Sequence, residues 1–221
     1  MLRPKQTRSY LSVTILVGMF ALVVGCSGKP DEGTTKPSNQ EKSAGRNDSS
    51  QGVWTPNPDF VKVLTKKETF GTYSILLPND FTSNAQPSLL PSLQSFSWKG
   101  PSREGGPPSI FVVTIFSNPK AVADATKNMR QFLVNYSAGL TDESGVNIAR
   151  REATETGALD GIAFSRFRWT GTAKNQQTAQ GFAYGGIDGN KLITVVTFSV
   201  GGDGEATNKL LESIVATLKR Q

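Results

Sequence analysis

The sequence predicts an α+β fold, a single domain in which a mainly antiparallel sheet of about six or seven strands lies between helices. Two continuous apolar runs, residues 109–116 and 191–200, are typical of central strands that are covered on both faces. Two amphipathic segments, residues 119–136 and 205–218, are expected to be the helices that cover them. The turns between the later strands are short, which favours antiparallel pairing because a parallel crossover needs about a dozen residues or more.

The first elements of the domain are expected to be strands. The stretch ETFGTYSILLPNDF alternates polar and apolar residues before Pro78, which indicates a strand that ends in a turn. Its apolar positions are Tyr73, Ile75 and Leu77. LQSFSWKG, residues 93–100, is typical of a second strand, and the glycine- and proline-rich residues 100–109 predict a long loop. The apolar run that follows is then the third strand.

The first helix is expected to begin at Asn118 and Pro119, because a capping residue followed by proline favours a helix start. One apolar face then recurs at spacings of three and four, at Val122, Ala125, Met129, Phe132, Leu133 and Tyr136. Three further strands are predicted at residues 147–155, 161–170 and 177–187. The Asp-Gly turn in GIDGNKL connects the last of these strands to the second apolar run.

The last helix is predicted to carry its apolar residues on one face, namely Ala206, Leu210, Leu211, Ile214, Val215 and Leu218. Glu205 and Lys209 would form an ion pair one turn apart. Lys219 and Arg220 would lie at the negative C-terminal end of the helix dipole. The predicted order is therefore strand, strand, strand, helix, four strands, helix.

The amino-terminal residues 1–25 have the layout of a signal peptide. Arg3, Lys5 and Arg8 form a basic head, and residues 11–25 carry no charge. That uncharged stretch is shorter than the roughly 20 residues that a membrane-spanning helix needs. We therefore expect the segment to be removed rather than retained in the membrane.

The tetrapeptide VVGC, which contains the only cysteine of the chain, resembles the lipobox of bacterial lipoproteins. It comprises Val23, Val24, Gly25 and Cys26, and it lies where the apolar run ends. The resemblance implies transfer of a diacylglyceryl group to the Cys26 sulfur, cleavage before Cys26 and acylation of the new amine. Two or more acyl chains give stable membrane anchoring. An ordinary secretory signal with an incidental cysteine is the alternative, although a leftover thiol is unusual in an exported domain.

The polar composition of residues 26–52 predicts a disordered tether that begins at the lipidated Cys26. Residues 53–221 then form the globular domain. The residue that follows the lipidation site is Ser27 rather than an aspartate. By analogy with enteric sorting, a serine at this position predicts that the anchor lies in the outer membrane and faces the periplasm, if the cell has two membranes.

The domain resembles the PsbP-like superfamily. The resemblance rests on FGTYSILLPNDF at its start, the helix in mid-chain and the closing helix EATNKLLESIVATLKR, and it covers most of residues 60–221 in pattern. The best-known member is the extrinsic PsbP protein of photosystem II, and the family includes lipid-anchored bacterial members. The resemblance implies an α/β/α sandwich that acts as a docking or assembly protein without catalysis. Metal sites of some relatives are not carried over because the sequence has no matching cluster, so we expect neither a metal nor a cofactor.

Composition excludes several kinds of catalysis. The chain has no histidine, which removes the usual general base and the commonest metal ligand. With Cys26 committed to lipid, no thiol nucleophile remains. Ser117 and Lys120 have the spacing of penicillin-recognising serine enzymes, but the other motifs of that class are missing and helix capping explains these residues. We therefore expect no enzyme, and hydrolysis by paired carboxylates is the catalytic alternative that stays open.

The stretch FSRFRW is the best candidate for a contact surface. Arg166 and Arg168 would share one face of a strand, beside Trp169. Arg150 and Arg151 in the preceding predicted strand would extend it. Aromatic rings beside guanidinium groups can bind single-stranded nucleic acid or a sugar polymer, although such a strand more often has an apolar inner face and a charged rim.

Loss of the signal peptide removes three basic residues, so the net charge of +6 falls to +3. A mature protein without a clustered basic face is not expected to bind nucleic acid. The sequence thus predicts a membrane-anchored lipoprotein whose domain is a non-catalytic binding or assembly module for an envelope protein. One alternative is a small-molecule or lipid-binding module with a cleft between sheet and helix. The other is a histidine-free hydrolase with two carboxylates about 5–9 Å apart in a pocket.

Overall fold

The computed structural model describes residues 52–84, 92–101, 107–202 and 204–221. Cys26 and the rest of the predicted lipobox lie outside the described residues, as does most of the predicted tether. The described elements are β1 (Gly52–Val53), α1 (Pro58–Val61), β2 (Lys66–Phe70), β3 (Tyr73–Leu77), β4 (Thr82–Ser83), β5 (Leu93–Lys99), β6 (Ile110–Phe116), α2 (Pro119–Lys127), α3 (Met129–Glu143), β7 (Val146–Arg151), β8 (Glu155–Leu159), β9 (Ile162–Ala173), β10 (Thr178–Asp188), β11 (Lys191–Val200), α4 (Gly204–Val215) and β12 (Lys219–Arg220).

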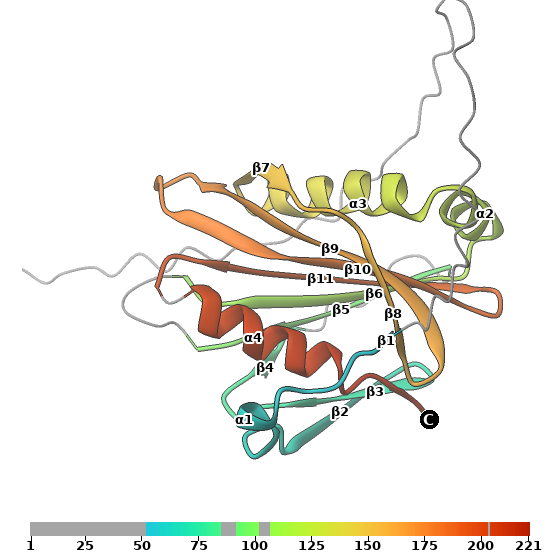
Figure 1. The fold of residues 1–221 in the computed structure, drawn as a ribbon, viewed down its shortest axis with the longest axis horizontal. Coiled ribbons are helices and arrows are strands. Elements are labelled where there is room, and N and C mark those ends of the chain that lie inside the picture. The colour runs from blue at the N-terminus through green and yellow to red at the C-terminus, as the bar shows by residue number, and fades with distance from the viewer. Residues whose placement is uncertain (1–51, 85–91, 102–106, 203) are drawn as a thin grey trace, which may run out of the picture. The chain divides into compact units, whose positions relative to one another are not determined.

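The main sheet has nine strands and is mostly antiparallel (Figure 1). Its order is β1-β8-β9-β10-β11-β6-β5-β4, and β7 also pairs with β9. Only the pairing of β1 with β8 is parallel among the described strands of this sheet. The predicted α+β class and antiparallel pairing are confirmed. The predicted number of strands was too small, because the structure adds short edge strands and a second sheet of three strands.

The strand predicted at residues 147–155 ends at Arg151 as β7, and a separate strand that was not predicted, β8, begins at Glu155; the two pair with different parts of β9. Strand β7 lies opposite the C-terminal half of β9, with a register shift between Ile148 and Arg150. Strand β8 lies opposite its N-terminal half. Strand β9 is long enough to hold both partners along one edge, so the chain turns between them where the sequence shows no glycine or proline.

The second sheet, in the order β12-β3-β2, was not predicted. The predicted alternation is confirmed in β3, where Tyr73, Ile75 and Leu77 have at most 1% of their surface exposed. The prediction for the chain end was wrong, because α4 ends at Val215, and Lys219 and Arg220 form β12 opposite Ser74 and Tyr73. Arg220 is held there by Asp188, whose carboxylate accepts two hydrogen bonds from its guanidinium at 3.0 and 2.8 Å.

Helices cover both faces of the main sheet (Figure 1). Helices α2 and α3 lie on one face, and α4 lies on the other beside the small sheet. The predicted helix start is confirmed, since Asn118 Oδ1 accepts a hydrogen bond from Lys120 N at 2.8 Å. The single first helix is instead two helices, because Asn128 leaves the helical conformation (φ −154°) and its side chain caps α3 at Gln131 N. None of the described helices is both long and apolar enough to cross a membrane.

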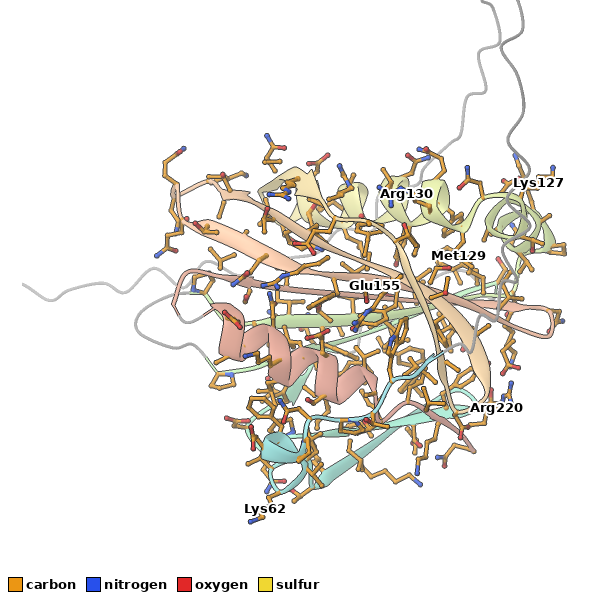
Figure 2. All side chains as sticks on the ribbon, viewed as in Figure 1. Lys62, Lys127, Met129, Arg130, Glu155 and Arg220 are labelled. Atoms are coloured by element: carbon orange, nitrogen blue, oxygen red, sulfur yellow. The ribbon has the colours of Figure 1, made fainter. Side chains whose placement is uncertain are left out.

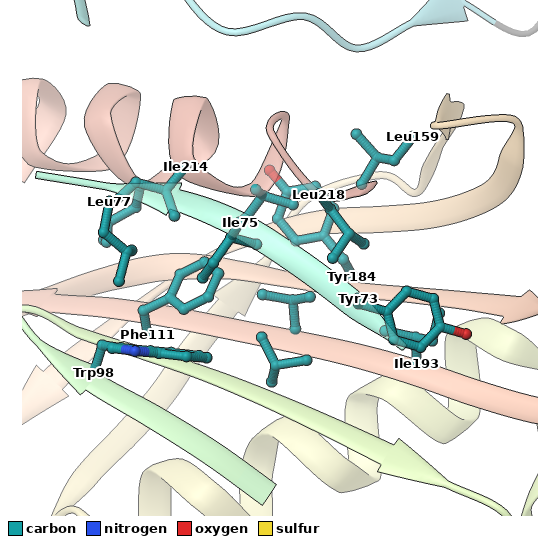
Figure 3. Packing of buried hydrophobic residues seen from close by; sticks show 14 of the residues in the cluster. Tyr73, Ile75, Leu77, Trp98, Phe111, Leu159, Tyr184, Ile193, Ile214 and Leu218 are labelled. Atoms are coloured by element: carbon teal, nitrogen blue, oxygen red, sulfur yellow. The ribbon is translucent and has the colours of Figure 1, made fainter. Parts of the chain in front are cut away.

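Each face of the sheet has its own apolar core. Figure 3 shows the core under α4, where Ile75 and Leu77 of β3 lie between Ile214 of α4 and the rings of Phe111 and Trp98. The core under α3 is formed by Leu133, Val146, Phe167, Trp169, Ala179, Ala183, Val196, Phe198 and Val200. Because successive residues of a strand point to opposite faces, β9 contributes to both cores.

Candidate binding cleft

A cleft of about 330 Å³ lies between α4 and the main sheet. Its third wall is the segment that enters the domain, residues 53–57, which we call the N-terminal strap. The residues that line the cleft are Val53, Trp54, Thr55, Asn57, Leu159, Arg166, Tyr184, Lys209, Glu212, Ser213, Val215 and Ala216. A cleft between sheet and helix is the feature that a small-molecule module requires.

Arg166 is the central side chain of the cleft. Its Nε donates a hydrogen bond to Glu155 Oε2 at 2.8 Å, and its Nη1 donates to Glu212 Oε1 at 2.8 Å. The same Nη1 is 3.3 Å from the hydroxyl oxygen of Tyr184. The register explains this arrangement, because Glu155 on β8 and Tyr184 on β10 both lie opposite Arg166 on β9. Glu212 is added from α4, and Glu155 is labelled in Figure 2.

The aromatic ring of Trp54 packs against the Arg166 guanidinium. The guanidinium carbon lies 4.5 Å from the Trp54 ring centroid, within the range of a cation–π interaction. Trp54 also meets Tyr184 edge to face, with the ring centroids 5.6 Å apart. The ring of Phe182 lies 5.6 Å from the same guanidinium carbon. Three aromatic rings therefore surround one cation.

The N-terminal strap is positioned by strand pairing and by one glycine. Trp54 N donates to Ala158 O at 3.1 Å, which continues the parallel pairing of β1 with β8. A Cβ atom on Gly157 would lie 2.4 Å from the Trp54 ring, so the indole needs a residue without a side chain beneath it. Asn57 N donates to Ser213 Oγ at 3.1 Å, which fixes the other end of the strap to α4.

Burial sets the electrostatics of the cleft. Burial raises the pKa of Glu212 above its ordinary value, and the charges of Arg166 and Arg168 oppose that rise. Burial also raises the pKa of the Tyr184 hydroxyl, so Tyr184 stays neutral at physiological pH. Glu155 is more exposed than Glu212, with 59% of its side-chain surface exposed against 30%. The Arg166 charge is thus shared between two carboxylates in different environments.

The structure brings together only some of the predicted contact residues. Arg166 and Arg168 share the α4 face of β9, and Arg168 Nη2 donates to Gln180 Oε1 at 3.3 Å. Trp169 points to the other face, where it has 0% of its surface exposed and packs near Phe198.

The two arginines of β7 are divided in the same way. Arg151 lies opposite Trp169, and exposed Arg150 lies opposite Thr170, so their side chains leave the sheet on opposite faces. The five residues of the predicted surface therefore do not form one patch, and Arg166 alone among them lines the cleft.

Cleft members that sequence reasoning missed include Asn57, Trp54, Tyr184 and Glu212. Trp54 precedes the first strand that periodicity could identify, and Tyr184 lies in the strand predicted at residues 177–187, for which no site was predicted. The pair of Arg166 with Glu212 joins residues 46 positions apart, which no local pattern reports. Gly157 lies opposite Phe164 in the pairing of β8 with β9. A glycine inside a strand can mark a place where a large group packs closely, so Gly157 was a sequence feature that could have indicated the position of the Trp54 ring.

Within the described part of the chain, no group of three or more histidine, cysteine, aspartate or glutamate residues is placed to hold a metal ion. Glu155 and Glu212 meet at the guanidinium of Arg166, which already supplies a cation between them.

No family model and no curated protein matches the chain. Among solved structures, the cyanobacterial PsbP protein (CyanoP) of Synechocystis is similar over 71% of this chain and 92% of that chain, with a TM-score of 0.50 and 13% identity. The chain has a PsbP-like fold. A Bacteroides thetaiotaomicron protein (TM-score 0.42, 15% identity) is similar over 72% of this chain, which spans 49% of that protein's length. A Pseudomonas aeruginosa protein of unknown function (TM-score 0.41, 11% identity) is similar over 71% of this chain and 96% of that chain.

Proposed function

We propose that the chain is a bacterial lipoprotein, anchored through Cys26, whose PsbP-like domain is a non-catalytic binding or assembly module in the cell envelope. In a two-membrane cell it would stand on the outer membrane and face the periplasm. The observation that carries the binding role is the cleft beside α4, whose charged groups are bonded to one another rather than left available for chemistry. The anchoring role is supported by the lipobox-like VVGC.

Two features favour binding over catalysis. The chain lacks histidine, so proton transfer near neutral pH would depend on carboxylates or tyrosines. Of the two carboxylates bonded to Arg166, only Glu212 lines the cleft, and a hydrolase of this kind needs both acids to flank the bond that breaks. A carboxylate hydrolase is therefore the less favoured alternative.

A small-molecule module is the second candidate, and the cleft itself favours it. The cleft volume is at the lower end of the range of about 300–1,000 Å³ that is usual for small-ligand sites. Two aromatic rings and several polar side chains line it, which is the usual composition of such sites. The same polar lining makes a long acyl chain a poor ligand.

The test uses intact cells of the source organism and two readouts. A fatty-acid probe should label the wild-type chain and a Ser27→Ala control, and it should not label Cys26→Ala. In the same cells, a photo-crosslinking residue at exposed Thr55, on the cleft wall, should give a discrete adduct with an envelope protein. A crosslinker at exposed Asp142, on α3, is the matched control and should give none.

Full labelling of Cys26→Ala would refute the anchor. Identical adducts from Thr55 and Asp142, or none from either, would refute a partner site at the cleft. Hydrolysis of a cell-envelope substrate by the purified chain, lost in Glu212→Gln, would replace the binding role with the catalytic alternative.

A further inference from the structure

We propose that the cleft binds a small neutral polyhydroxylated ligand, a sugar or polyol, through Tyr184, Glu212 and Asn57. This inference rests on the proposed binding function and names the chemistry of the ligand. It follows from three properties of the cleft: which hydrogen-bonding groups are unused, how the charges are compensated, and where the aromatic rings lie.

The unused hydrogen-bonding groups of the cleft include both donors and acceptors. The Tyr184 hydroxyl accepts from Arg166, while none of the described residues accepts its hydrogen. Glu212 uses Oε1 for Arg166, and no described residue donates to its Oε2. Asn57 uses Oδ1 for the α1 cap, and its Nδ2 donates to none of the described side chains or backbone atoms. The cleft thus offers two donor groups and one acceptor.

This combination of two hydrogen-bond donors and one acceptor fits the hydroxyl groups of a ligand better than it fits an ion. A hydroxyl both donates and accepts, so neighbouring hydroxyls can satisfy donors and acceptors that alternate along a wall. A carboxylate or phosphate only accepts and would leave Glu212 Oε2 facing another anion. An ammonium group only donates and would face the Tyr184 hydrogen and the Asn57 amide hydrogens.

The charges in the cleft lead to the same conclusion. Arg166 lies 2.8 Å from both Glu155 and Glu212, and Lys209 lies 3.0 Å from Glu205. Each cation that lines the cleft therefore has a carboxylate partner, and among the described lining residues no unpaired cation is left to attract an anion. A charged ligand would have to break one of these pairs, whereas a neutral ligand leaves them intact.

The aromatic rings give the ligand an apolar surface to lie on. Trp54 and Tyr184 line the cleft and meet edge to face, so they form two walls of a corner. The carbon-bound hydrogens of a sugar ring are apolar and gain from contact with aromatic carbon, while the hydroxyls at its rim reach the polar groups. A cleft of about 330 Å³ suits one or two such rings.

The test titrates the full chain, purified in detergent as the cell makes it, with named probes. The neutral probes are glucose, galactose, mannose, N-acetylglucosamine and maltose, and the charged probes are glucose 6-phosphate and glucosamine. Saturation-transfer NMR should detect at least one neutral probe, with a Kd of about 1 mM or tighter. The phosphorylated and amino forms of the sugar that binds should bind at least tenfold more weakly.

Variants tie the binding to the cleft. Tyr184→Phe keeps the ring and removes the hydroxyl, and it should weaken sugar binding about fivefold to tenfold, the loss expected for one hydrogen bond. Asp142→Asn is the control, since it changes an exposed carboxylate on α3, on the other face of the sheet, and it should leave binding unchanged. Circular dichroism checks that both variants fold.

If no neutral probe binds, if the charged forms bind as well as the neutral ones, or if Tyr184→Phe binds like the wild type, the inference is wrong. That failure is distinguishable from failure of the proposed function, because lipid labelling and crosslinking from Thr55 are measured independently of sugar. Sugar binding that survives in a chain without a crosslinked partner would support the small-molecule candidate alone.

Discussion

The two faces of the main sheet are closed in different ways. On the α3 face, β10 presents Gly181, Ala183 and Gly185, and α3 packs so closely that a Cβ on Gly185 would lie 2.6 Å from Met129 sulfur. On the α4 face, the intervening residues of the same strand are Phe182 and Tyr184. Their rings lie in the core under α4, and Tyr184 also lines the cleft. The two faces of one strand therefore differ in side-chain size, and the cleft lies on the face that carries the large rings.

The neighbouring strand shows the same division in polarity. In β9, Arg166 and Arg168 face α4, while Phe167 and Trp169 face α3. The α3 face has no ion pair in its described core, and its stability rests on apolar burial. On the α4 face, guanidinium and carboxylate groups lie next to apolar residues. The area that these charged groups cover adds nothing to the burial of apolar surface on that face. The two faces therefore differ in polarity: apolar burial alone closes the α3 face, whereas the α4 face combines the larger apolar core with the polar candidate site.

The largest expected effect is on the α3 face. Trp169→Ala should lower the free energy of unfolding by about 3–5 kcal/mol, because it opens a cavity where the ring was completely buried. Urea denaturation monitored by circular dichroism measures the loss. A loss below about 1 kcal/mol would show that α3 can collapse onto the sheet, and the contrast between the faces would fail.

A smaller effect is expected on the α4 face. Arg166→Met retains an unbranched side chain but removes the guanidinium group. Glu212 and Tyr184 then lose the hydrogen-bond donor that they share. We expect a loss of about 1–3 kcal/mol, the cost of an unsatisfied partly buried polar group. The matched control is Arg150→Met at an exposed position, which should stay within about 0.5 kcal/mol of the wild type. Equal values for both variants would show that Arg166 is a surface charge and not the centre of a site.

The smallest effect is in the pH dependence. Because the folded state raises the pKa of Glu212 above the 4.5 expected for the unfolded chain, the folded state binds more protons just above pH 4.5. The free energy of unfolding should therefore fall as the pH rises through that interval and then level off. Glu212→Gln should reduce this fall, while Glu205→Gln should keep it; Glu143, whose pKa burial also raises, contributes the remainder. Trp169→Ala should shift the whole curve without changing its shape, since an indole does not titrate in this range.

Unfolding measured by urea at a series of pH values gives these curves. A Glu212→Gln curve with the slope of the wild type would mean that the carboxylate is hydrated and that the α4 face is not a partly buried polar site.

Several elements could be predicted because their signals are local. The runs that became β6 and β11 are mostly apolar, and a sheet that buries both faces favours such strands at its centre. The Asn118 cap depends on a hydrogen bond to a residue two positions away, and the Asp-Gly hairpin depends on Gly189, whose φ is +60°. Such features use only neighbouring residues, so the sequence alone determines them.

The tertiary structure decided what depends on pairing at long range. The separate strands β7 and β8 follow from the length of β9, which holds both along one edge, and β12 forms because Asp188 and β3 are available to hold Arg220. The cleft joins a strap at residue 54, a strand at 166 and a helix at 212, three segments that periodicity treats as independent. Periodicity reports which face a side chain takes within its own element, and only the packed sheet determines which other elements that face meets.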